Sequence, residues 1–430
     1  MGASTTELKP RFITGWKLDF LKLKVGLSFG KYVLQRKKFP LFSLSLWNMI
    51  KLQRDLGISK AVRFGNHYYY AILRNPRWPS PAFDEMVARR GFDAYAKGHP
   101  LKTPTDSVIL AFSRECLYSC QHCYEKLSLG QKDSVPLKRW KEIVRELQDI
   151  GVNVVILSGG EPMLRYEELL ELLESGNKNI SEFHLHSSGY GLTLDKALRL
   201  KAAGLGAAGI GLEDPNPERY DKFRGCKGAF REAVEALKNL NRAGVFTYTN
   251  MFLKKEVIQE GDLKNYLELV KNLGGGIVLF LEAKPCGEYL FGNMDEALSE
   301  TERKLATEFF LEANRRKEYR HHPLIHYYSY YEKPERFGCL MGGLSHFYVD
   351  SGGHVEPCIY MPVSFGNILD ENLTEIYQRM RKAIPRPLIR GCPSVWLAEK
   401  IRLKRKKDSI LPLPFSEIEA EWHELYEKDL

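Results

Sequence analysis

The sequence lacks long hydrophobic runs and has no leader pattern. No uninterrupted apolar stretch reaches the length of about 18 residues that a membrane span needs, and Met1 is not followed by the charged segment, apolar core and small-residue cleavage site of a signal peptide. Basic residues are not gathered into one stripe either, since the net charge of +9 comes from 63 Lys and Arg against 54 Asp and Glu spread along the chain. We therefore expect a cytoplasmic protein that does not bind nucleic acid.

Cysteine is also scarce, with eight residues in a chain of 430. In a reducing compartment, cysteines that lie close together in the sequence are expected to bind metal rather than to form disulfides. The remaining composition, 44% hydrophobic and 27% charged, is ordinary for a globular protein, and the length allows one large domain with smaller ones beside it.

From about residue 106, short apolar runs alternate with helical patterns, as they do in repeated βα units around a parallel sheet. The expected strands cover residues 107–113, 153–158, 182–188, 207–213, 246–253 and 277–283. The expected helices cover residues 136–150, 165–175, 194–203, 228–243, 262–273 and 301–317. Because crossovers between parallel strands are right-handed, these six units predict a partial, TIM-like (β/α)6 barrel over residues 106–320, with its sites at the carboxyl ends of the strands.

Three further regions flank the predicted barrel. Residues 1–105 are expected to form a mainly helical extension, with amphipathic helices over 16–34 and 42–56 and a strand or hairpin over 62–72. The helical pair either packs on the barrel or lies as a peripheral contact on an anionic membrane, which its lysines and aromatic residues would favour. Residues 321–400 change to short, Gly-punctuated segments and are expected to form a small separate domain, followed by a tail over 401–430.

Three cysteines lie in the loop that follows the first expected strand. Cys116, Cys120 and Cys123 have a CxxxCxxC spacing, which is one thiolate short of the four protein ligands of a structural zinc site or an ordinary [4Fe-4S] cluster. His122 would complete a zinc site, although its adjacency to Cys123 makes joint chelation awkward. If the metal is instead an iron-sulfur cluster, one iron is left for a ligand from outside the chain.

This spacing, followed by Tyr124, resembles the signature of the radical S-adenosylmethionine (SAM) superfamily. The resemblance implies that Cys116, Cys120 and Cys123 hold a [4Fe-4S] cluster whose open iron chelates the amino and carboxylate groups of SAM. It also implies that one electron, from a reduced flavodoxin- or ferredoxin-type donor, cleaves SAM to methionine and a 5′-deoxyadenosyl radical. Tyr124 is counted by the same resemblance among the residues of the SAM site.

The turns after the second and third strands carry further likenesses to this family. Gly159, Gly160, Glu161 and Pro162 resemble its GGEP motif, whose backbone orients the SAM amino group, and the two glycines allow a close backbone approach. Ser188 stands where relatives have a Thr-Asn-Gly turn near the SAM ribose, so a hydroxyl would replace the amide.

Glu213 and Arg224 follow the fourth strand, in segments that resemble the Ser-Leu-Asp and Phe-Arg-Gly segments of the family. The resemblance implies that Glu213 faces the SAM ribose and that Arg224 pairs with the SAM carboxylate. A structural ion pair is the alternative for both residues. Gly211, where relatives have serine, removes one polar contact.

Three more cysteines lie in the expected small domain. The segment 350–353 predicts a hairpin turn that brings Cys339 and Cys358 together. With Cys392, this spacing resembles a SPASM or twitch domain, which implies one auxiliary [4Fe-4S] cluster; a small zinc knot is the alternative. The fourth ligand of the cluster stays open between substrate, water and Cys286.

The resemblance implies an enzyme that generates a 5′-deoxyadenosyl radical to abstract a hydrogen atom from a substrate. Because SPASM and twitch relatives often modify peptides or proteins, a peptide is the first expectation for the substrate. A lipid or another small molecule is the second, motivated by the amphipathic N-terminal region. The rival from another class is a non-catalytic iron-sulfur protein that passes electrons or senses redox state.

Overall fold

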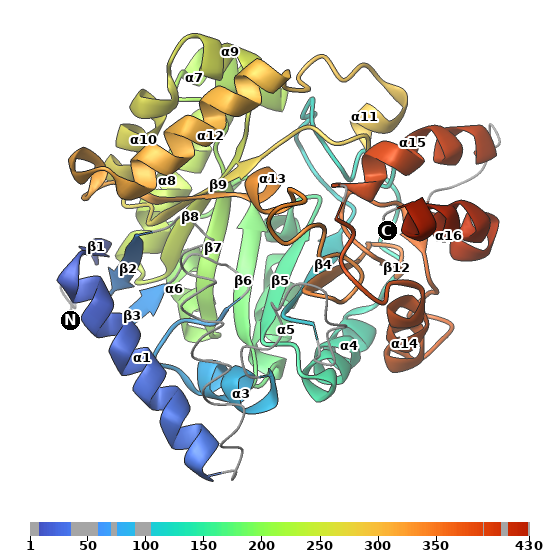
Figure 1. Cartoon of the computed structure of the whole chain (residues 1–430), viewed down its shortest axis with the longest axis horizontal. Coiled ribbons are helices and arrows are strands. Elements are labelled where there is room, and N and C mark those ends of the chain that lie inside the picture. The colour runs from blue at the N-terminus through green and yellow to red at the C-terminus, as the bar shows by residue number, and fades with distance from the viewer. Residues whose placement is uncertain are drawn as a thin grey trace.

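The computed structural model describes residues 8–35, 59–69, 75–90, 105–389, 391–405 and 412–428. Its centre is a nine-stranded sheet in the order β10-β9-β8-β7-β6-β5-β4-β11-β12, in which only the β11–β12 pair is antiparallel (Figure 1). The strands are β4 (Ser107–Ser113), β5 (Val154–Gly159), β6 (Glu182–Ser187), β7 (Leu205–Gly211), β8 (Phe246–Phe252), β9 (Ile277–Leu281), β10 (Leu324–Tyr327), β11 (His346–Val349) and β12 (Val355–Glu356). The predicted partial α/β barrel is confirmed.

Helices follow the barrel strands on the outside of the sheet. They are α4 (Leu137–Ile150), α5 (Tyr166–Ser175), α6 (Leu194–Ala202), α8 (Ala229–Arg242), α10 (Leu263–Asn272) and α12 (Glu300–Arg315), with the short α7 (Pro217–Arg224), α9 (Lys255–Gln259), α11 (Glu288–Phe291) and α13 (Tyr328–Tyr331) between them. The helix α4 illustrates the pattern: Trp140, Ile143, Val144 and Leu147 are buried at helical spacing, and Gly151 ends the helix with a φ of 99°.

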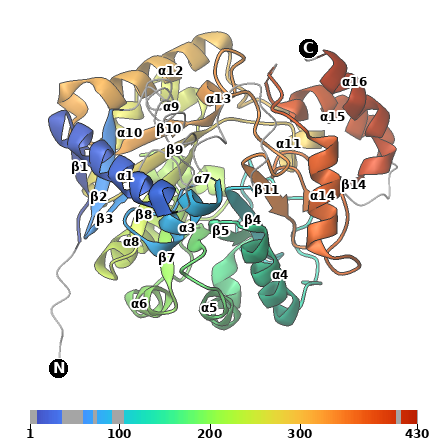
Figure 2. The ribbon, with the colours of Figure 1, turned by 60° about the horizontal axis from the view of Figure 1, so that its bottom comes forward.

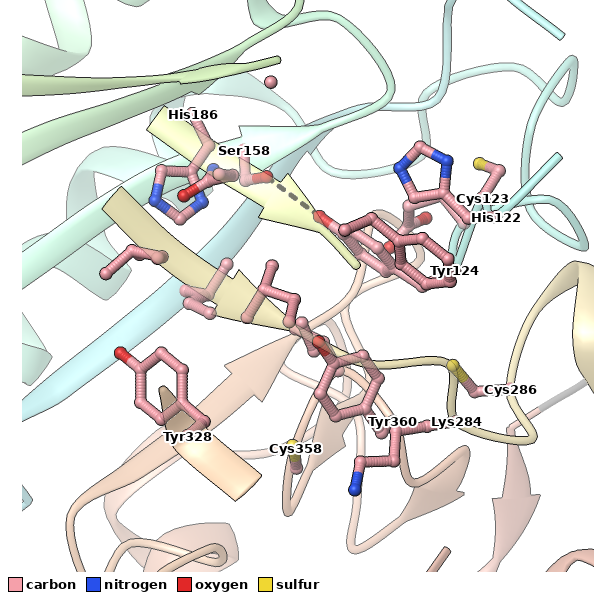
Figure 3. Close-up of a pocket in the computed structure, with 18 of the residues that line it drawn as sticks. His122, Cys123, Tyr124, Ser158, His186, Lys284, Cys286, Tyr328, Cys358 and Tyr360 are labelled. Atoms are coloured by element: carbon pink, nitrogen blue, oxygen red, sulfur yellow. Dashed lines mark hydrogen bonds between the residues drawn. The ribbon is translucent and has the colours of Figure 1, made fainter. Parts of the chain in front are cut away.

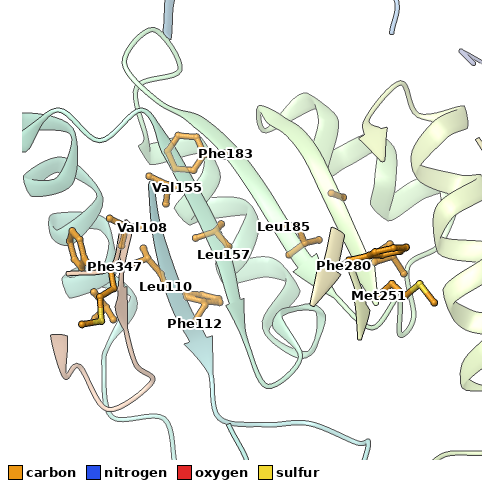
Figure 4. Packing of buried hydrophobic residues seen from close by; sticks show 14 of the residues in the cluster. Val108, Leu110, Phe112, Val155, Leu157, Phe183, Leu185, Met251, Phe280 and Phe347 are labelled. Carbon is orange, nitrogen blue, oxygen red and sulfur yellow. The ribbon is translucent and has the colours of Figure 1, made fainter. Parts of the chain in front are cut away.

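Alternation along the strands separates the outer core from the barrel interior. Val108, Leu110 and Phe112 of β4 are buried among the outer core residues (Figure 4), where the Phe112 and Trp140 ring centroids lie 6.3 Å apart. Ile109, between them, lines the cavity inside the barrel. Each fully buried large apolar side chain contributes about 1.5–3 kcal/mol. The same strand thus stabilises the fold on one face and shapes the site on the other.

The sheet continues beyond the range expected for the barrel. The strand β10 pairs in parallel with β9, so that a boundary at residue 320 would separate a strand from the sheet to which it is hydrogen-bonded. At the other edge, β11 from the C-terminal region pairs in parallel with β4. The boundary predicted at residue 320 therefore stays a prediction. The central sheet contains strands from both sides of that boundary, since β10 and β11 lie beyond it.

The N-terminal region contains a three-stranded antiparallel sheet as well as helices. Its elements are β1 (Arg11–Thr14), α1 (Trp16–Gln35), β2 (Lys60–Phe64), β3 (His67–Tyr69) and α3 (Pro81–Arg90). Tyr69 stacks on Phe246 at 3.7 Å between ring centroids. The same core cluster contains Ala207, Phe246 and Ile277, which lie at or near the first residues of β7, β8 and β9. This sheet therefore packs at the amino ends of the barrel strands, away from the predicted sites. The helix predicted over 42–56 lies outside the described residues.

The C-terminal region packs beside β4 and α4, on the opposite side of the molecule from α1 (Figure 2). It contains α14 (Leu373–Ala383), α15 (Pro393–Lys404) and α16 (Glu419–Lys428), and β13 (Val363–Ser364) pairs with β14 (Leu413–Pro414). Trp422 of α16 is fully buried and lies 5.9 Å from Phe365 between ring centroids. The described part of the predicted tail is therefore packed on this region. Within the described residues, no helix is both long enough and apolar enough to cross a membrane.

Candidate functional site

Seven of the eight cysteines line one cavity at the carboxyl ends of the barrel strands. Figure 3 labels three of them, Cys123, Cys286 and Cys358. The cavity has a volume of about 270 Å³ and extends from the barrel interior to the C-terminal region. The lining cysteines are Cys116, Cys120, Cys123, Cys286, Cys339, Cys358 and Cys392. The structure thus brings together the two cysteine sets that are more than 200 residues apart in the sequence, and it adds Cys286 to them.

The loop of Cys116, Cys120 and Cys123 is held in place by the end of α7. The backbone N–H groups of Ser119 and Gln121 donate to the carbonyls of Arg224 and Phe223, at 3.1 Å each. Burial raises the pKa of the Cys116 thiol to about 11, so this thiol is protonated at neutral pH until a metal displaces its proton.

A four-iron cluster fits the chemistry of this donor set. Among the described residues, no three His, Cys, Asp or Glu side chains converge closely enough to hold a single metal ion. The three thiols of one loop, with no fourth cysteine beside them in the sequence, agree with a [4Fe-4S] cluster that leaves one iron open. His122, considered above as a zinc ligand, instead stacks on Phe223 at 4.7 Å between ring centroids and 6° between planes.

Tyr124 lies directly behind the cysteine loop. Its hydroxyl and that of Ser158 are hydrogen-bonded at 2.9 Å, which ties the loop to the end of β5 (Figure 3). Both residues line the cavity. The hydroxyl of Tyr124 thus has a partner within the chain, and the side chain bridges two of the elements that surround the site.

Gly159 and Gly160 allow the β5 turn to approach the cysteine loop. Gly159 has a φ of +122°, and a Cβ there would lie 2.5 Å from the carbonyl oxygen of Ser113. A Cβ on Gly160 would lie 2.3 Å from the carbonyl oxygen of Glu115. The N–H groups of Gly160 and Glu161 donate to these same two carbonyls at 2.7 Å each. Glycine is therefore required here by contact with the neighbouring loop, whatever else the turn binds.

Glu161 is buried and accepts hydrogen bonds from four donors of the chain. Its Oε1 accepts from the Met163 N–H at 3.0 Å and the Ser187 hydroxyl at 2.8 Å. Its Oε2 accepts from the Ser188 N–H at 2.8 Å and the Ser188 hydroxyl at 2.5 Å. Pro162 follows and opens a short 3-10 helix. The carboxylate thus joins the turns after β5 and β6, which makes Glu161 a positioning residue by its contacts.

Arg224 and Glu213 form a buried, bidentate ion pair. Arg224 Nε donates to Glu213 Oε2 at 2.8 Å, and Arg224 Nη2 donates to Glu213 Oε1 at 2.5 Å. Arg224 Nη1 lies 3.6 Å from Cys120 Sγ. Burial alone would lower the pKa of Arg224, but the Glu213 carboxylate raises it well above its usual range, so the guanidinium stays charged. The fork of Arg224 is therefore engaged with Glu213, and its third nitrogen faces the cysteine loop.

The predicted hairpin is present in the C-terminal cysteine region. The strands β11 and β12 are antiparallel, and the turn between them closes with the Gly353 N–H donating to the Asp350 carbonyl at 3.0 Å. Cys339 is buried, and its N–H donates to the Leu388 carbonyl at 2.7 Å. Cys392 directly precedes α15, with its Sγ 3.0 Å from the Ser394 hydroxyl.

Several cavity residues carry no motif by which the sequence would have revealed them. His186, Asn250, Tyr328, Lys284 and Glu332 all line the cavity. His186 Nε2 and the Tyr248 hydroxyl are hydrogen-bonded at 2.9 Å, while the side-chain oxygen of Asn250 is buried without a hydrogen-bond partner. Strand position was the only available signal for His186 and Asn250, since both lie on strands of the barrel.

Two family models match the chain. The radical SAM superfamily matches residues 110–269, and the SPASM family, described as an iron-sulfur cluster-binding domain, matches residues 339–394. These ranges contain all six cysteines that the sequence motifs singled out.

Similar curated proteins have different names. An AdoMet-dependent heme synthase of Methanosarcina barkeri is 26% identical over 61% of this chain and 79% of the relative. A PqqA peptide cyclase of Gluconobacter oxydans is 26% identical over 64% of this chain and 77% of the relative. Among solved structures, SuiB of Streptococcus suis bound to its precursor peptide SuiA has a TM-score of 0.56 at 16% identity, covering 70% of this chain and 74% of SuiB. The structural likeness shows the fold.

Proposed function

The chain belongs to the radical SAM superfamily and carries a SPASM domain, and we propose that it abstracts a hydrogen atom from a substrate held in the shared cavity. As a member of this superfamily it is an enzyme that binds SAM, a [4Fe-4S] cluster and an auxiliary iron-sulfur cluster. The observation that carries the proposal is that both cysteine sets face one cavity of about 270 Å³. When bound, the cluster and SAM supply a 5′-deoxyadenosyl radical for this step.

The residues of the chain have distinct roles in this proposal. Cys116, Cys120 and Cys123 bind the cluster and leave one iron for SAM, and Cys339, Cys358 and Cys392 bind the auxiliary cluster. The remaining residues assigned to SAM are Tyr124, Gly159, Gly160, Glu161, Pro162, Ser188, Glu213 and Arg224. Among these, Glu161 acts by fixing the turns that carry the others, since its own oxygens are used within the chain. A reduced flavodoxin- or ferredoxin-type protein is the proposed electron donor.

A peptide is the proposed substrate, with one of its apolar side chains reaching into the barrel. The inner part of the cavity is lined by aliphatic residues, among them Ile109, Ile156 and Leu279, with His186 and Asn250 as nearby polar groups. Such a lining suits an apolar side chain with one hydrogen-bonding group beside it. The 26% identity with a PqqA peptide cyclase supports the peptide, whereas the identity of similar size with a heme synthase supports a small molecule as the alternative.

The test of this function measures SAM cleavage by the anaerobically reconstituted chain. With SAM and dithionite, we expect 5′-deoxyadenosine, and we expect none when Cys116, Cys120 and Cys123 are changed to Ala. Cys226→Ala is the matched control, because this cysteine does not line the cavity. Absence of 5′-deoxyadenosine with every reductant and substrate tried would favour the non-catalytic iron-sulfur protein instead.

The substrate class is tested by isotope transfer. Candidate peptides deuterated on their apolar side chains should give deuterated 5′-deoxyadenosine, because the abstracted atom is carried to the nucleoside. Transfer from a deuterated lipid or tetrapyrrole extract, but from none of the peptides, would replace the peptide proposal by its alternative.

A second candidate, action on a lipid at a membrane surface, is favoured by the exposed face of α1. Trp16, Phe20, Leu23 and Leu27 recur at helical spacing and are 73%, 53%, 58% and 65% exposed. The opposite face of the helix, with Leu18 among its residues, is buried against α3. Four large apolar side chains in one exposed row are unusual for a helix that is already packed on its other face.

The charges of α1 suit an anionic membrane. Lys17, Lys22 and Lys24 accompany the apolar row, with Asp19 as the acidic residue of the first turn. Each lysine near an anionic membrane contributes about 1 kcal/mol. We propose that this face binds such a membrane peripherally, where a lipid substrate would be available.

Flotation with vesicles of phosphatidylcholine and phosphatidylserine tests this contact. The chain should float at low salt, and the double change Leu23→Glu with Leu27→Glu should reduce the bound fraction at least tenfold. Leu305→Glu, an exposed leucine on α12, is the matched control. Equal flotation of all three proteins, or none by the unchanged chain, would contradict the contact.

A further inference from the structure

The deepest part of the cavity is an inner layer of side chains from strands inside the barrel. The layer is formed by Ile109, Ile156, His186, Asn250 and Leu279, all of which line the cavity. Figure 3 shows His186 on the opposite side of the cavity from Cys123 and Cys286. The residues assigned to SAM lie in loops or at or beyond the ends of their strands, whereas Asn250 lies two residues inside the end of β8. The inner layer is therefore open to the substrate rather than to SAM.

Asn250 has a fixed backbone and a side-chain oxygen without a partner. Its backbone carbonyl accepts from the Leu212 N–H at 3.1 Å, and it pairs in register with Gly211 and Leu279 on the two neighbouring strands. Its side-chain oxygen is nevertheless buried, and no described residue donates a hydrogen bond to it. A buried acceptor without a donor destabilises a folded chain, and native proteins seldom contain one without a use.

The rest of the inner layer carries no charge. Three of its side chains are aliphatic, and the imidazole of His186 is hydrogen-bonded at 2.9 Å to the hydroxyl of the fully buried Tyr248. Burial lowers the pKa of His186 to about 3, so this imidazole is neutral at neutral pH. None of the five side chains could therefore neutralise a carboxylate, which is costly to bury without a charged partner.

We propose that Asn250 is a substrate-binding residue that recognises a neutral amide group, its side-chain oxygen accepting from an N–H and its NH2 donating to a carbonyl. One residue of an extended peptide offers this pair of groups, because its N–H and C=O face the same side of the chain. The proposal deepens the proposed function and rests on it, since it assigns part of the substrate cavity. The apolar side chain of the bound residue would then lie against Ile109 and Ile156.

This arrangement favours a peptide over the alternative substrates. A fatty acid or a tetrapyrrole presents carboxylates, for which the inner layer has no cation. A ligand without an amide N–H would also leave the Asn250 oxygen unpaired in a closed cavity, and such unpaired groups are how a polar site rejects an analogue. Because Asn250 lies on a central strand of the sheet, its amide is held at a defined position before the substrate binds.

The first test asks whether the Asn250 side chain stabilises the fold. In the anaerobically reconstituted chain without substrate, Asn250→Leu should leave the urea midpoint unchanged or raise it, because leucine is similar in size and buries no polar atom. Asn314→Leu is the matched control and should lower the midpoint, since this buried asparagine exchanges hydrogen bonds of 2.9 and 3.0 Å with the backbone of Ile325. An equal loss in both variants would make Asn250 structural and overturn the proposal.

The second test measures binding of a defined probe, N-acetyl-L-leucinamide, in the presence of SAM. Its matched partner is the diester in which oxygen replaces both nitrogens, and octanoate represents the carboxylates. Ligand-observed NMR titration should give a Kd at least tenfold lower for the amide than for either of the others. Asn250→Leu should reduce this preference to less than twofold, whereas Asn265→Leu, the same change at an exposed position of α10, should keep it. Equal Kd values, or no binding of the amide by the unchanged chain, would overturn the proposal.

A third measurement separates the substrate from SAM, whose adenine also presents donor and acceptor groups. If Asn250→Leu raises the Kd of SAM tenfold or more in equilibrium dialysis, Asn250 binds SAM and the proposal is wrong. None of these readouts depends on SAM cleavage. A chain that makes no 5′-deoxyadenosine but prefers the amide contradicts the proposed function alone, whereas normal cleavage without that preference contradicts the role of Asn250 alone.

Discussion

The substitution Gly211→Ala should disrupt the buried ion pair between Arg224 and Glu213. Gly211 ends β7, and its φ is not in the left-handed region, so alanine fits the backbone there. A Cβ at this position would nevertheless lie 1.7 Å from Arg224 Nη2, which cannot stay where it is. The resemblance to the family suggested that glycine in place of serine only removes a polar contact, but a side chain at this position would displace Arg224.

The expected loss in the free energy of unfolding depends on the hydrogen bonds that Arg224 would lose. The end of an arginine side chain moves easily when it is free, but here it makes two charge-assisted hydrogen bonds, at 2.8 and 2.5 Å, to a buried carboxylate. Breaking a buried pair costs about 3–5 kcal/mol, because both charges stay desolvated. In a strand without this neighbour, Gly→Ala would instead stabilise by about 0.5–1 kcal/mol.

A double-mutant cycle tests whether Gly211→Ala acts by breaking the ion pair or only by its effect on the backbone of the strand. Urea unfolding of the anaerobically reconstituted chain should show a loss of about 3–5 kcal/mol for Gly211→Ala, and the same substitution in an Arg224→Ala background should be neutral or slightly stabilising. SAM affinity measured by equilibrium dialysis should fall with the single variant, because the pair is part of the proposed SAM site. Additive effects of the two substitutions would refute the reasoning.

Three further outcomes follow from other contacts of the site. Glu161→Gln should lower the free energy of unfolding by about 2–3 kcal/mol in urea, because an amide nitrogen would face donors of Ser188; an unchanged midpoint would contradict its role. Tyr124→Phe and Ser158→Ala should each cost about 1 kcal/mol, and the double variant should cost no more than either, since they share one hydrogen bond. Burial lowers the pKa of the His186 imidazole from 6.5 to about 3. Between pH 6.5 and pH 3 this imidazole is therefore protonated in the unfolded chain but not in the folded chain, so the free energy of unfolding falls as the pH falls. His186→Gln should therefore reduce the pH slope of stability by about 1.4 kcal/mol per pH unit between pH 6 and 4.5; equal slopes for the two proteins would refute this assignment.

The barrel could be predicted because its signals are local. Each strand is a short apolar run next to a helix with a buried stripe, and β4 was predicted at its observed bounds, Ser107–Ser113. The strand β10 was missed because Leu324–Tyr327 is only four residues long and is not followed by a helix of the barrel pattern. The N-terminal sheet was foreseen only as one strand or hairpin, since the pairing of β1 with β2 joins residues about 50 positions apart.

The motif residues could be located from the sequence, but their partners could not. Glu161 was expected among the SAM contacts, whereas its oxygens accept four hydrogen bonds from residues up to 27 positions away. Both roles considered for Arg224 involve a carboxylate, and sequence spacing cannot distinguish that of Glu213 from that of SAM. Which carboxylate Arg224 contacts depends on side-chain positions that differ by a few tenths of an ångström, and only the packing of the folded chain determines them.

The position of Cys286 gives the two cysteine sets a common mechanical support. Gly287 and Glu288 are held on the Cys123 carbonyl, and Leu290 is held by α15, so the segment cannot move away from either region without breaking a hydrogen bond. Because β11 also pairs with β4, which leads into the first cysteine loop, the C-terminal region is attached to the barrel on both sides of the cavity. Displacement of this region would therefore change the walls of the substrate cavity and the surroundings of Cys123 together. For that reason, substitutions that weaken the contact of α15 with Leu290, such as Arg402→Ala, are expected to alter the EPR signals of both clusters, whereas a C-terminal region that moved independently would leave the SAM-site signal unchanged.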